Sequence, residues 1–540
     1  MEFIKKNIGY LIVLSGLGFF VYAFNLHGPL FWDDADWILN NPTVQALTWT
    51  NIKFLFSHDA LASIGSSSNY YRPFLFLTFL FNYIISGTAP VLYHLINNTI
   101  HIANALMLFY LVVRWLKNQR VAFLAALLFL IHPLQTEALT YVVGRGDPLS
   151  VAFMLAGIIL FLHHRRWLAG LAMILAILTK ETAVLFPLYL ALGLIAFEYR
   201  LRWWRAIRQA FFDVWPFLGV AIIYGLLRLT ALNFQNTLNF YTQQNFYSTH
   251  LSVRLYTFFH VLLVYGRLII WPVGLHMDRD IAISFSLATG WAWLGFLGLV
   301  ILVGWLIFLY KYEGMSQKFS VWLFGTGIFF INLGPTSGII PANARIYEHW
   351  LYVPLMGAGL IVGFYLDRLL SIIKKRKPVL FPFVIIILVG YFGFLGIQTI
   401  RRNLLWGDTE AFYKNILYYE PTDVRVLNNL GNWYSDRGNT TDAAPLYQRA
   451  IDADPTQPAP YYNLGNIARD TGQLDQAEEL YKKSIAINPN FHYAYGNLAQ
   501  IYLNQNKPVQ ALEMLQQLQK IYPTAQTKQN IEMLQKLINK

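Results

Sequence analysis

Hydrophobic and polar positions divide the chain into two regions. Over the first 400 residues, long apolar runs alternate with short polar segments, and many runs approach the ~20 residues that a helix needs to cross a bilayer. These runs predict eleven membrane-spanning helices near residues 7–24, 91–113, 121–138, 148–162, 167–180, 182–198, 212–230, 290–310, 319–334, 349–367 and 379–399. Two more apolar stretches, 73–86 and 252–271, lack flanking basic clusters, so we expect re-entrant helices or helices lying on the membrane surface.

Basic residues gather between the apolar runs and indicate the orientation of the chain. The clusters are Lys5 and Lys6; Arg114, Lys117 and Arg120; Arg165 and Arg166; Arg200, Arg202, Arg205 and Arg208; Lys311 and Lys318; and Arg368 with Lys374 to Lys377. Cytoplasmic clusters place the N-terminus inside and make 7–24 an uncleaved first span. An odd number of spans then leaves the C-terminal region outside. We expect an integral membrane protein, in the plasma or inner membrane if prokaryotic.

The last 120 residues repeat with a period of 34. The repeated positions are Pro421, Pro455, Pro489 and Pro523; Leu430, Leu464 and Leu498; Gly431, Gly465 and Ala499; and Ala443, Ala477 and Ala511. This period and pattern are those of tetratricopeptide repeats (TPRs), in which small residues let two helices approach and a proline ends the second. We expect units at 421–454, 455–488 and 489–522, a terminal capping helix, and a connector at 401–420. The fold class is all-α: a polytopic membrane domain over 1–400, then a TPR α-solenoid.

Composition agrees with a membrane protein. The chain is 56% hydrophobic and 13% charged, with a mean hydropathy of +0.40, which excludes an ordinary soluble enzyme. The net charge is +12, but 14 Lys and Arg and 14 Asp and Glu follow residue 400, so the excess lies between the apolar runs. Membrane topology explains that excess better than nucleic-acid binding. With no cysteine, disulfides, a thiol nucleophile and cysteine metal sites are excluded.

The first external loop carries an acid pair, Asp33 and Asp34, in FWDDADW. One carboxylate could act as a general base while the other orients a partner, provided that the backbone turns between them. A solvated acid pair or a helix N-cap is the alternative. Arg72 follows in the same loop, where it could bind a phosphate through two hydrogen bonds or mark a lipid headgroup anchor.

A polar stripe runs along the apolar segment 91–113. It contains His94, Asn97, His101 and Asn104, with Asn98 beside it. Residues seven apart lie about 10.5 Å apart along a helix, too far for one metal ion. Hydrogen bonding between helices and the lining of a substrate cavity both stay open.

Further polar groups occur in the other external loops. Together with those above, the candidate residues for binding donor phosphate or substrate are Arg72, His94, Asn98, His101, His132, Glu137, Arg145, Asp147, Lys180, Glu181, Arg345, Glu348 and His349. Ionisable groups at membrane depth are costly and are functional candidates by default. Most of these map to one face of the membrane, and that convergence is the main functional argument.

Outside the cytoplasm an enzyme must use activated groups carried by lipids. A polyprenyl phosphate-linked sugar suits these residues, because an acid can activate an acceptor hydroxyl while cations neutralise the leaving phosphate. Direct displacement would invert the anomeric centre. The ligand spacing requires no metal ion, although a divalent ion stays open.

Several strings resemble the GT-C superfamily of membrane glycosyltransferases, in particular its TMTC-like branch of O-mannosyltransferases with C-terminal TPRs. They are FWDDADWILNNP, YYRPF, YHLINNTIHIANAL, HPLQTEALTYVVGRGDPLS, KE at 180–181 and IYEHWLYVP, which with the repeats span nearly the whole chain. The resemblance implies an external active site, a polyprenyl phosphate sugar (mannose in eukaryotic relatives), and Asp33 or Asp34 as base. It departs at Gln135, where His is expected, and at Trp350, where Arg is usual. The second change removes a candidate phosphate ligand that Arg345 could replace.

The repeats suggest a second role, since three TPRs offer a concave surface for a peptide or partner. Following the last span, they would present an acceptor protein or glycan to the active site. A stabilising or oligomerising appendage is the alternative. Two other functions stay open: a non-catalytic TPR scaffold, and an O-antigen ligase or polymerase. The latter typically uses one large late external loop, which this chain lacks.

Overall fold

The computed structural model describes residues 2–64, 68, 70–199, 203–232, 245–340 and 344–538. Every regular element among them is helical, which confirms the predicted all-α class. The chain divides into two compact units, Met1–Thr409 and Glu410–Lys540. The residues expected as a connector at 401–420 are themselves mostly helical, because they form the end of α16 (Phe381–Trp406) and α17 (Thr409–Tyr419).

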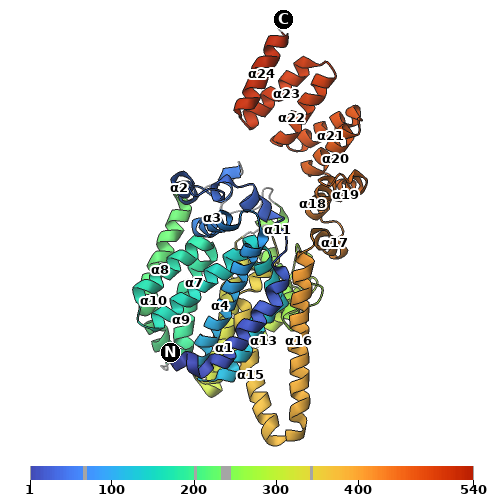
Figure 1. Ribbon diagram of the computed structural model, residues 1–540. Coiled ribbons are helices and arrows are strands. Elements are labelled where there is room, and N and C mark those ends of the chain that lie inside the picture. The colour runs from blue at the N-terminus through green and yellow to red at the C-terminus, as the bar shows by residue number, and fades with distance from the viewer. Residues whose placement is uncertain are drawn as a thin grey trace. The chain divides into compact units, whose positions relative to one another are not determined.

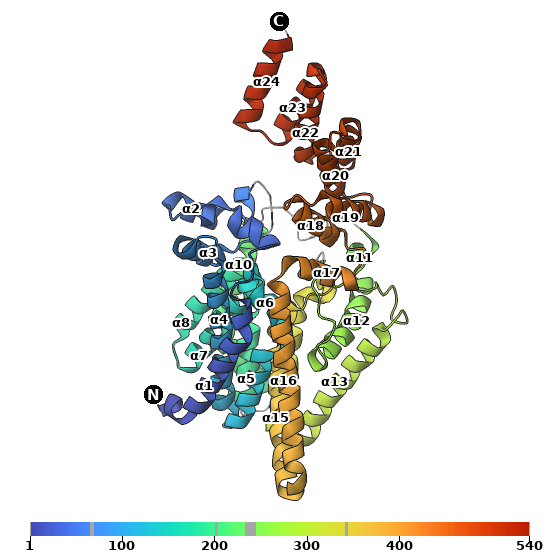
Figure 2. The same ribbon diagram turned by 45° about the vertical axis from the view of Figure 1, so that its right-hand side comes forward.

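The first unit contains the apolar helices (Figures 1 and 2). Nine helical segments of the described residues are long and apolar enough to cross a membrane: Glu2–Asn25, Pro90–Leu116, Val142–Leu162, Glu181–Glu198, Trp203–Leu229, Leu251–Ile270, Ala292–Glu313, Pro354–Arg376 and Pro378–Trp406. A tenth candidate is the bent pair Gln119–Ile131 and Pro133–Thr140, with an angle of 52°.

In the labels of Figure 1, the apolar helices of this unit are α1 (Glu2–Tyr22), α4 (Pro90–Leu116), α5 (Gln119–Ile131), α7 (Gly146–Leu162), α9 (Phe186–Gly193), α10 (Trp203–Leu229), α12 (Leu251–Ile270), α13 (Ala292–Glu313), α15 (Pro354–Arg376) and α16. Shorter helices are α2 (Trp49–Ser57), α3 (Pro73–Ser86), α8 (Arg166–Thr179), α11 (Phe246–Thr249) and α14 (Gln317–Leu333).

The eleven predicted spans are therefore only partly reproduced. The stretch 252–271, expected to be re-entrant or interfacial, is the unbroken 20-residue helix α12 and qualifies as a span by length and composition. The runs 167–180 and 319–334 form α8 and α14, of 14 and 17 residues, which are not among the nine candidate spans of the described residues. Part of the cluster at 200–208, namely Arg200 and Arg202, lies outside the described residues.

Apolar side chains on the outside of α13 and α16 indicate which surface meets lipid. Ile301 and Ile307 on α13 and Ile386, Ile387 and Val389 on α16 are all more than 60% exposed. Such dense exposure of large aliphatic groups is unfavourable in water and suits hydrocarbon. The protein is accordingly an integral membrane protein.

Small residues allow the helices of the membrane unit to pack closely. On α15, Gly357 lies against Gly325 of α14, so a Cβ atom on Gly357 would come within 2.3 Å of the Gly325 carbonyl oxygen. Two residues further, a Cβ on Gly359 would come within 2.8 Å of the Ala125 carbonyl oxygen on α5. Because lipid offers no hydrophobic drive between helices, such close backbone contacts stabilise their association.

The second unit consists of helix pairs, with prolines between successive pairs. They are α18 (Val424–Ser435), α19 (Thr440–Ala453), α20 (Pro458–Asp470), α21 (Leu474–Ile487), α22 (His492–Asn504), α23 (Pro508–Ile521) and α24 (Ala525–Ile538). The Tyr447 ring fills the space above Gly431, where a Cβ would lie 2.5 Å from it, and Tyr481 does the same at Gly465. The small repeat positions therefore admit an aromatic ring from the paired helix, as the repeat pattern predicts.

The contact between α14 and α15 yields a stability prediction. We expect Gly357→Ala to lower the free energy of unfolding by about 1–3 kcal/mol, because the added methyl group meets backbone rather than a movable side chain. The matched control is Gly390→Ala on α16, which has nothing within 4 Å of an added Cβ. Thermal unfolding of the purified protein in detergent measures both. Equal midpoints for the two variants would contradict this account of the packing.

Candidate active site

A short segment of the membrane unit, His132–Pro148, contacts most of the polar groups predicted to be functional. We call it the hub segment. It contains η5 (Pro133–Gln135), α6 (Thr136–Thr140), η6 (Val142–Arg145) and the start of α7. Because the chain changes direction between these short helices, successive side chains face different neighbours. The hub segment therefore contacts loop one, the 180–181 pair and the late loop around Glu348.

The two loop-one acids lie in different environments. Asp33 is exposed, and its Oδ2 accepts a hydrogen bond of 2.6 Å from the Tyr141 hydroxyl. Asp34 is 1% exposed, and its Oδ1 accepts the backbone N–H of Val143 at 2.8 Å. The preceding residue, Trp32, has a left-handed φ of 61°. The backbone therefore turns sharply at this point, as it must if the two acids are to have separate roles.

The burial of Asp34 also changes its protonation. Burial raises the pKa of Asp34 to about 8, although the backbone N–H groups that it accepts lower it. At neutral pH its carboxyl group therefore carries a proton much of the time. Of the two acids, Asp33 is the one with access to an incoming hydroxyl group.

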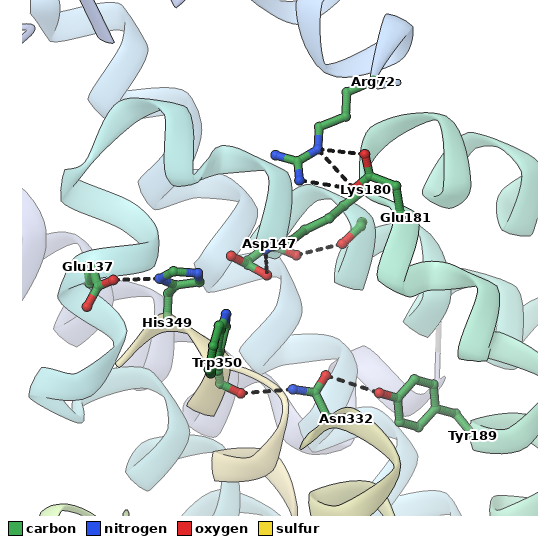
Figure 3. Close-up of polar contacts among 10 residues, drawn as sticks. Arg72, Glu137, Asp147, Lys180, Glu181, Tyr189, Asn332, His349 and Trp350 are labelled. Atoms are coloured by element: carbon green, nitrogen blue, oxygen red, sulfur yellow. Dashed lines mark hydrogen bonds and ion pairs between the residues drawn. The ribbon is translucent and has the colours of Figure 1, made fainter. Parts of the chain in front are cut away.

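Glu137 joins the hub segment to the late loop. Its Oε1 lies 2.5 Å from Nδ1 of His349, and its Oε2 accepts the backbone N–H of Glu348 at 3.2 Å. His349 begins η10 (His349–Leu351), and Figure 3 shows its ring directed toward Glu137. Two residues 212 positions apart in the sequence are thereby paired.

Glu348 lies between two arginines that the sequence analysis did not select. Arg402 of α16 places Nη1 2.7 Å from Glu348 Oε2, in an ion pair without hydrogen-bond alignment, and Arg279 places Nη2 3.7 Å from Oε1. Burial raises the pKa of Glu348 to about 7, whereas Arg402 and Arg279 lower it. All three side chains are nearly buried, with exposures of 3%, 7% and 12% for Glu348, Arg402 and Arg279. This is a buried basic cluster beside an acid.

Two more ion pairs involve the 180–181 dipeptide, and Figure 3 draws them beside Glu137 and His349. Arg72 Nε lies 3.1 and 3.2 Å from the two carboxylate oxygens of Glu181, and its Nη2 lies 3.0 Å from Oε2. Lys180 Nζ lies 2.6 Å from Asp147 Oδ1. The Arg72 guanidinium also lies 4.4 Å from the centre of the Tyr70 ring. Both pairs join segments that are far apart in the sequence.

The polar stripe on α4 is occupied by contacts between helices. His94 bonds to the Gly28 carbonyl at 3.0 Å, and His101 bonds to the Tyr352 hydroxyl at 2.8 Å. Asn98 exchanges hydrogen bonds with Asn25. Such bonds are what buried polar groups need in hydrocarbon, so this geometry favours interhelical hydrogen bonding over the lining of a cavity.

Arg145 and His132 are likewise committed to the protein. Arg145 is fully buried, and all three guanidinium nitrogens donate to neutral acceptors, including Asn97 Oδ1 at 2.6 Å and Asn82 Oδ1 at 2.5 Å. His132 Nε2 bonds to the Ile269 carbonyl at 3.0 Å. Arg145 is therefore better explained as an anchor of the hub segment than as a phosphate ligand.

The remaining late-loop residues lie near the buried basic cluster in sequence but have other partners. Arg345 pairs with Asp280. Trp350 packs edge-on against Tyr347. In the hub segment, the buried Gln135 donates through Nε2 to the Phe129 carbonyl at 3.4 Å and the Tyr352 carbonyl at 3.5 Å. Pro341 to Asn343 of the late motif lie outside the described residues. Within the part of the chain that the structure describes, no group of three or more His, Asp or Glu side chains could hold a metal ion.

The burial of Asp34 yields a pH prediction. Its pKa is about 8 in the folded protein and about 3.9 when unfolded, so ionisation of the unfolded chain lowers the stability of the wild type as pH rises between these values. Asp34→Asn removes this dependence and keeps an acceptor for Val143. We expect the variant's thermal midpoint, relative to wild type, to be higher at pH 8 than at pH 5. A difference that does not change with pH would contradict a buried, protonated Asp34.

Comparison with known proteins extends the picture to both units. A family model described as tetratricopeptide repeat matches residues 434–484 and 468–529. Protein O-mannosyl-transferase F38B6.6 of Caenorhabditis elegans is 28% identical over 83% of this chain and 63% of its own length. Human protein O-mannosyl-transferase TMTC3 is 25% identical over 82% of this chain and 51% of its own length. Protein O-mannosyl-transferase Tmtc1 of Drosophila melanogaster is 25% identical over 81% of this chain and 60% of its own length. The chain thus spans about half to two thirds of these curated relatives. It resembles the TMTC branch over most of its own length and carries tetratricopeptide repeats.

Proposed function

We propose that this chain is a membrane glycosyltransferase. It moves mannose or another hexose from a polyprenyl phosphate-linked donor to a hydroxyl group of a protein or surface glycan, on the extracytoplasmic side of the membrane. The observation that carries the proposal is the position of Asp33, an exposed carboxylate held at the hub segment, whose other side chains pair with basic groups. The similarity to proteins named O-mannosyl-transferases supports it.

Asp33 is the general base of this mechanism. Its carboxylate takes the proton of the acceptor hydroxyl, the hydroxyl oxygen forms a bond to the anomeric carbon, and the bond from that carbon to the phosphate oxygen breaks. The electron pair leaves with the polyprenyl phosphate, so the anomeric configuration inverts. The Tyr141 hydroxyl bonds one carboxylate oxygen and thereby orients the other. Asp34 acts as a positioning residue, since its bond to Val143 fixes the loop.

Basic residues near the hub segment stabilise the charge that develops on the leaving phosphate. Arg402 and Arg279, which pair with Glu348, have this role. His349, which pairs with Glu137, and Lys180, which pairs with Asp147, share it. Each of these basic groups is paired with an acidic side chain, so its position is set before the donor binds. Arg402 and Arg279 pair with Glu348, two residues before Trp350, where the resemblance leads us to expect arginine. The step as written uses no metal ion.

The second unit docks the acceptor protein or a partner. Its support is the stack of paired helices, α18 to α23, which matches the tetratricopeptide family over most of its length. Surfaces of this type bind peptides along their inner helices. In this proposal the repeats raise the local concentration of acceptor and take no part in bond formation.

Sugar transfer by the purified protein from a polyprenyl phosphate donor tests the assignment of Asp33. We expect Asp33→Asn to lower kcat by about 100-fold or more, because a general base typically contributes a factor of about 10² to 10⁴. The matched control is Asp36→Asn: Asp36 is exposed in the same loop and bonds only to nearby Asn40 among the described residues. We expect its kcat within about twofold of wild type.

Three other outcomes would change the assignment. Loss of transfer in Asp34→Asn with full activity in Asp33→Asn would make Asp34 the base. Equal activity in all variants would remove the loop-one acids from the mechanism. No transfer by folded wild type from any donor would favour the non-catalytic scaffold.

A further inference from the structure

The membrane unit has a polar cavity at the end opposite to the candidate active site. It has a volume of about 810 Å³ and is lined by the start of α1, the end of α4, the starts of α5 and α14, and the middle of α15. The candidate active site lies near the other ends of α1 and α4, because His94 of α4 contacts Gly28 in the loop that follows α1. The 27 residues of α4 span about 40 Å, so the two sites are separate. In Figure 2 the N-terminus lies at the end of this unit away from α2 and α3.

The charge around this cavity is positive. Four basic residues line it, Lys6, Lys117, Arg120 and Arg368, with the acids Glu2 and Asp367. Asp367 is already compensated, since Arg120 Nε lies 3.1 Å from its Oδ1 and the Asn118 side chain donates to its Oδ2 at 2.8 Å.

Three of the cations remain available to a ligand. Within the described residues, Lys6, Lys117 and Arg368 form no ion pair with a carboxylate. The Arg368 guanidinium instead lies 4.2 Å from the centre of the Phe364 ring, which supports the group without neutralising it. The cavity can therefore attract an anion.

The backbone adds to this potential. Residues at the starts of three helices line the cavity: Phe3 of α1, Gln119 of α5 and Gln317 of α14. The N-terminal end of a helix carries partial positive charge, so each start favours an anion. The N–H groups of Arg120 and Val121 are already bonded to the Asn118 side chain, and that of Phe319 to Ser316, so the contribution at these starts is the helix dipole. A single helix start would indicate little, but here three of them meet at one cavity with three available cations.

A buried amide indicates what else the ligand carries. Asn7 is 2% exposed and lines the cavity. Its Nδ2 donates to the Phe3 carbonyl at 2.8 Å, whereas its Oδ1 has no hydrogen-bond partner. A buried acceptor without a partner is costly, and a hydroxyl or ammonium donor on the ligand would satisfy it.

We infer that this cavity binds a phosphate ester bearing a hydroxyl or ammonium group, namely the headgroup of an anionic phospholipid. Lys6, Lys117 and Arg368 hold the phosphate, and Asn7 accepts a hydrogen bond from the headgroup. Basic pockets between membrane helices near the membrane surface bind such headgroups in this way. The inference does not depend on the proposed glycosyl transfer, since none of these residues belongs to the candidate active site.

Binding of short-chain phosphatidylglycerol to the purified full-length protein, followed by native mass spectrometry, tests the inference. Each basic side chain near a lipid headgroup contributes about fivefold to binding. We therefore expect the double variant Lys117→Gln/Arg368→Gln to weaken binding about 25-fold. The matched control is Lys374→Gln/Lys375→Gln, which removes the same charge from exposed positions further along α15, outside the cavity. We expect it to change binding by less than about threefold. Equal weakening by both double variants would overturn the inference, because binding would then follow net charge alone.

Two further measurements identify the ligand. Asn7→Leu should remove a preference for phosphatidylglycerol over its dimethylated headgroup analogue, which lacks the hydroxyl donors; an unchanged preference would overturn the role of Asn7. Soluble glycerol phosphate separates the two sources of a phosphate ester. Binding much weaker than that of phosphatidylglycerol supports a lipid, whereas equal affinity would overturn the assignment to a lipid.

Discussion

The need to satisfy every buried polar group in an apolar unit shapes the candidate active site. Arg145 is the clearest case, because a guanidinium with no exposed surface is tolerated only when its donors are bonded. Its bonds to Asn82 of α3 and Asn97 of α4 tie the hub segment to two helices. The residues on either side of Arg145 then have fixed positions, so that Tyr141 and Val143 meet the loop-one acids and Asp147 meets Lys180. The geometry of the candidate site therefore depends on Arg145, whose guanidinium nitrogens are all bonded within the protein.

Charge pairing divides the acids of this region into two kinds. Glu137, Asp147, Glu181 and Glu348 each have a basic partner within 4 Å, and these pairs link segments from loop one to α16. Asp33 is exposed, and its Oδ2 accepts a hydrogen bond from the Tyr141 hydroxyl. The pairs hold the segments of the candidate site together, and in the proposed mechanism the exposed Asp33 acts as the base.

The sequence determined the large divisions of this protein. A 34-residue period is a local property, since each repeat packs only on its neighbours, and α18 to α23 follow it closely. Apolar length likewise identified most of the membrane helices, because burial in hydrocarbon requires it whatever the neighbours are. The loops expected to be external were selected as polar segments, and Asp33, Glu137, Asp147 and Lys180 do lie on or against the hub segment.

Only the tertiary structure decided which polar residues meet one another and which form buried hydrogen bonds within the protein. The spacing of His94, Asn98 and His101 shows that they share a helix surface. It does not show that their hydrogen-bond partners are Gly28, Asn25 and Tyr352. Arg402 and Arg279 escaped selection because their partner Glu348 is distant in sequence and the local pattern around each is ordinary. For the stretch 252–271, missing basic flanks suggested a re-entrant or interfacial helix, whereas α12 is one unbroken helix of 20 residues that qualifies as a span by length and composition. Helical periodicity and hydropathy are properties of neighbouring residues, whereas ion pairs and buried hydrogen bonds join positions that only the folded chain brings together.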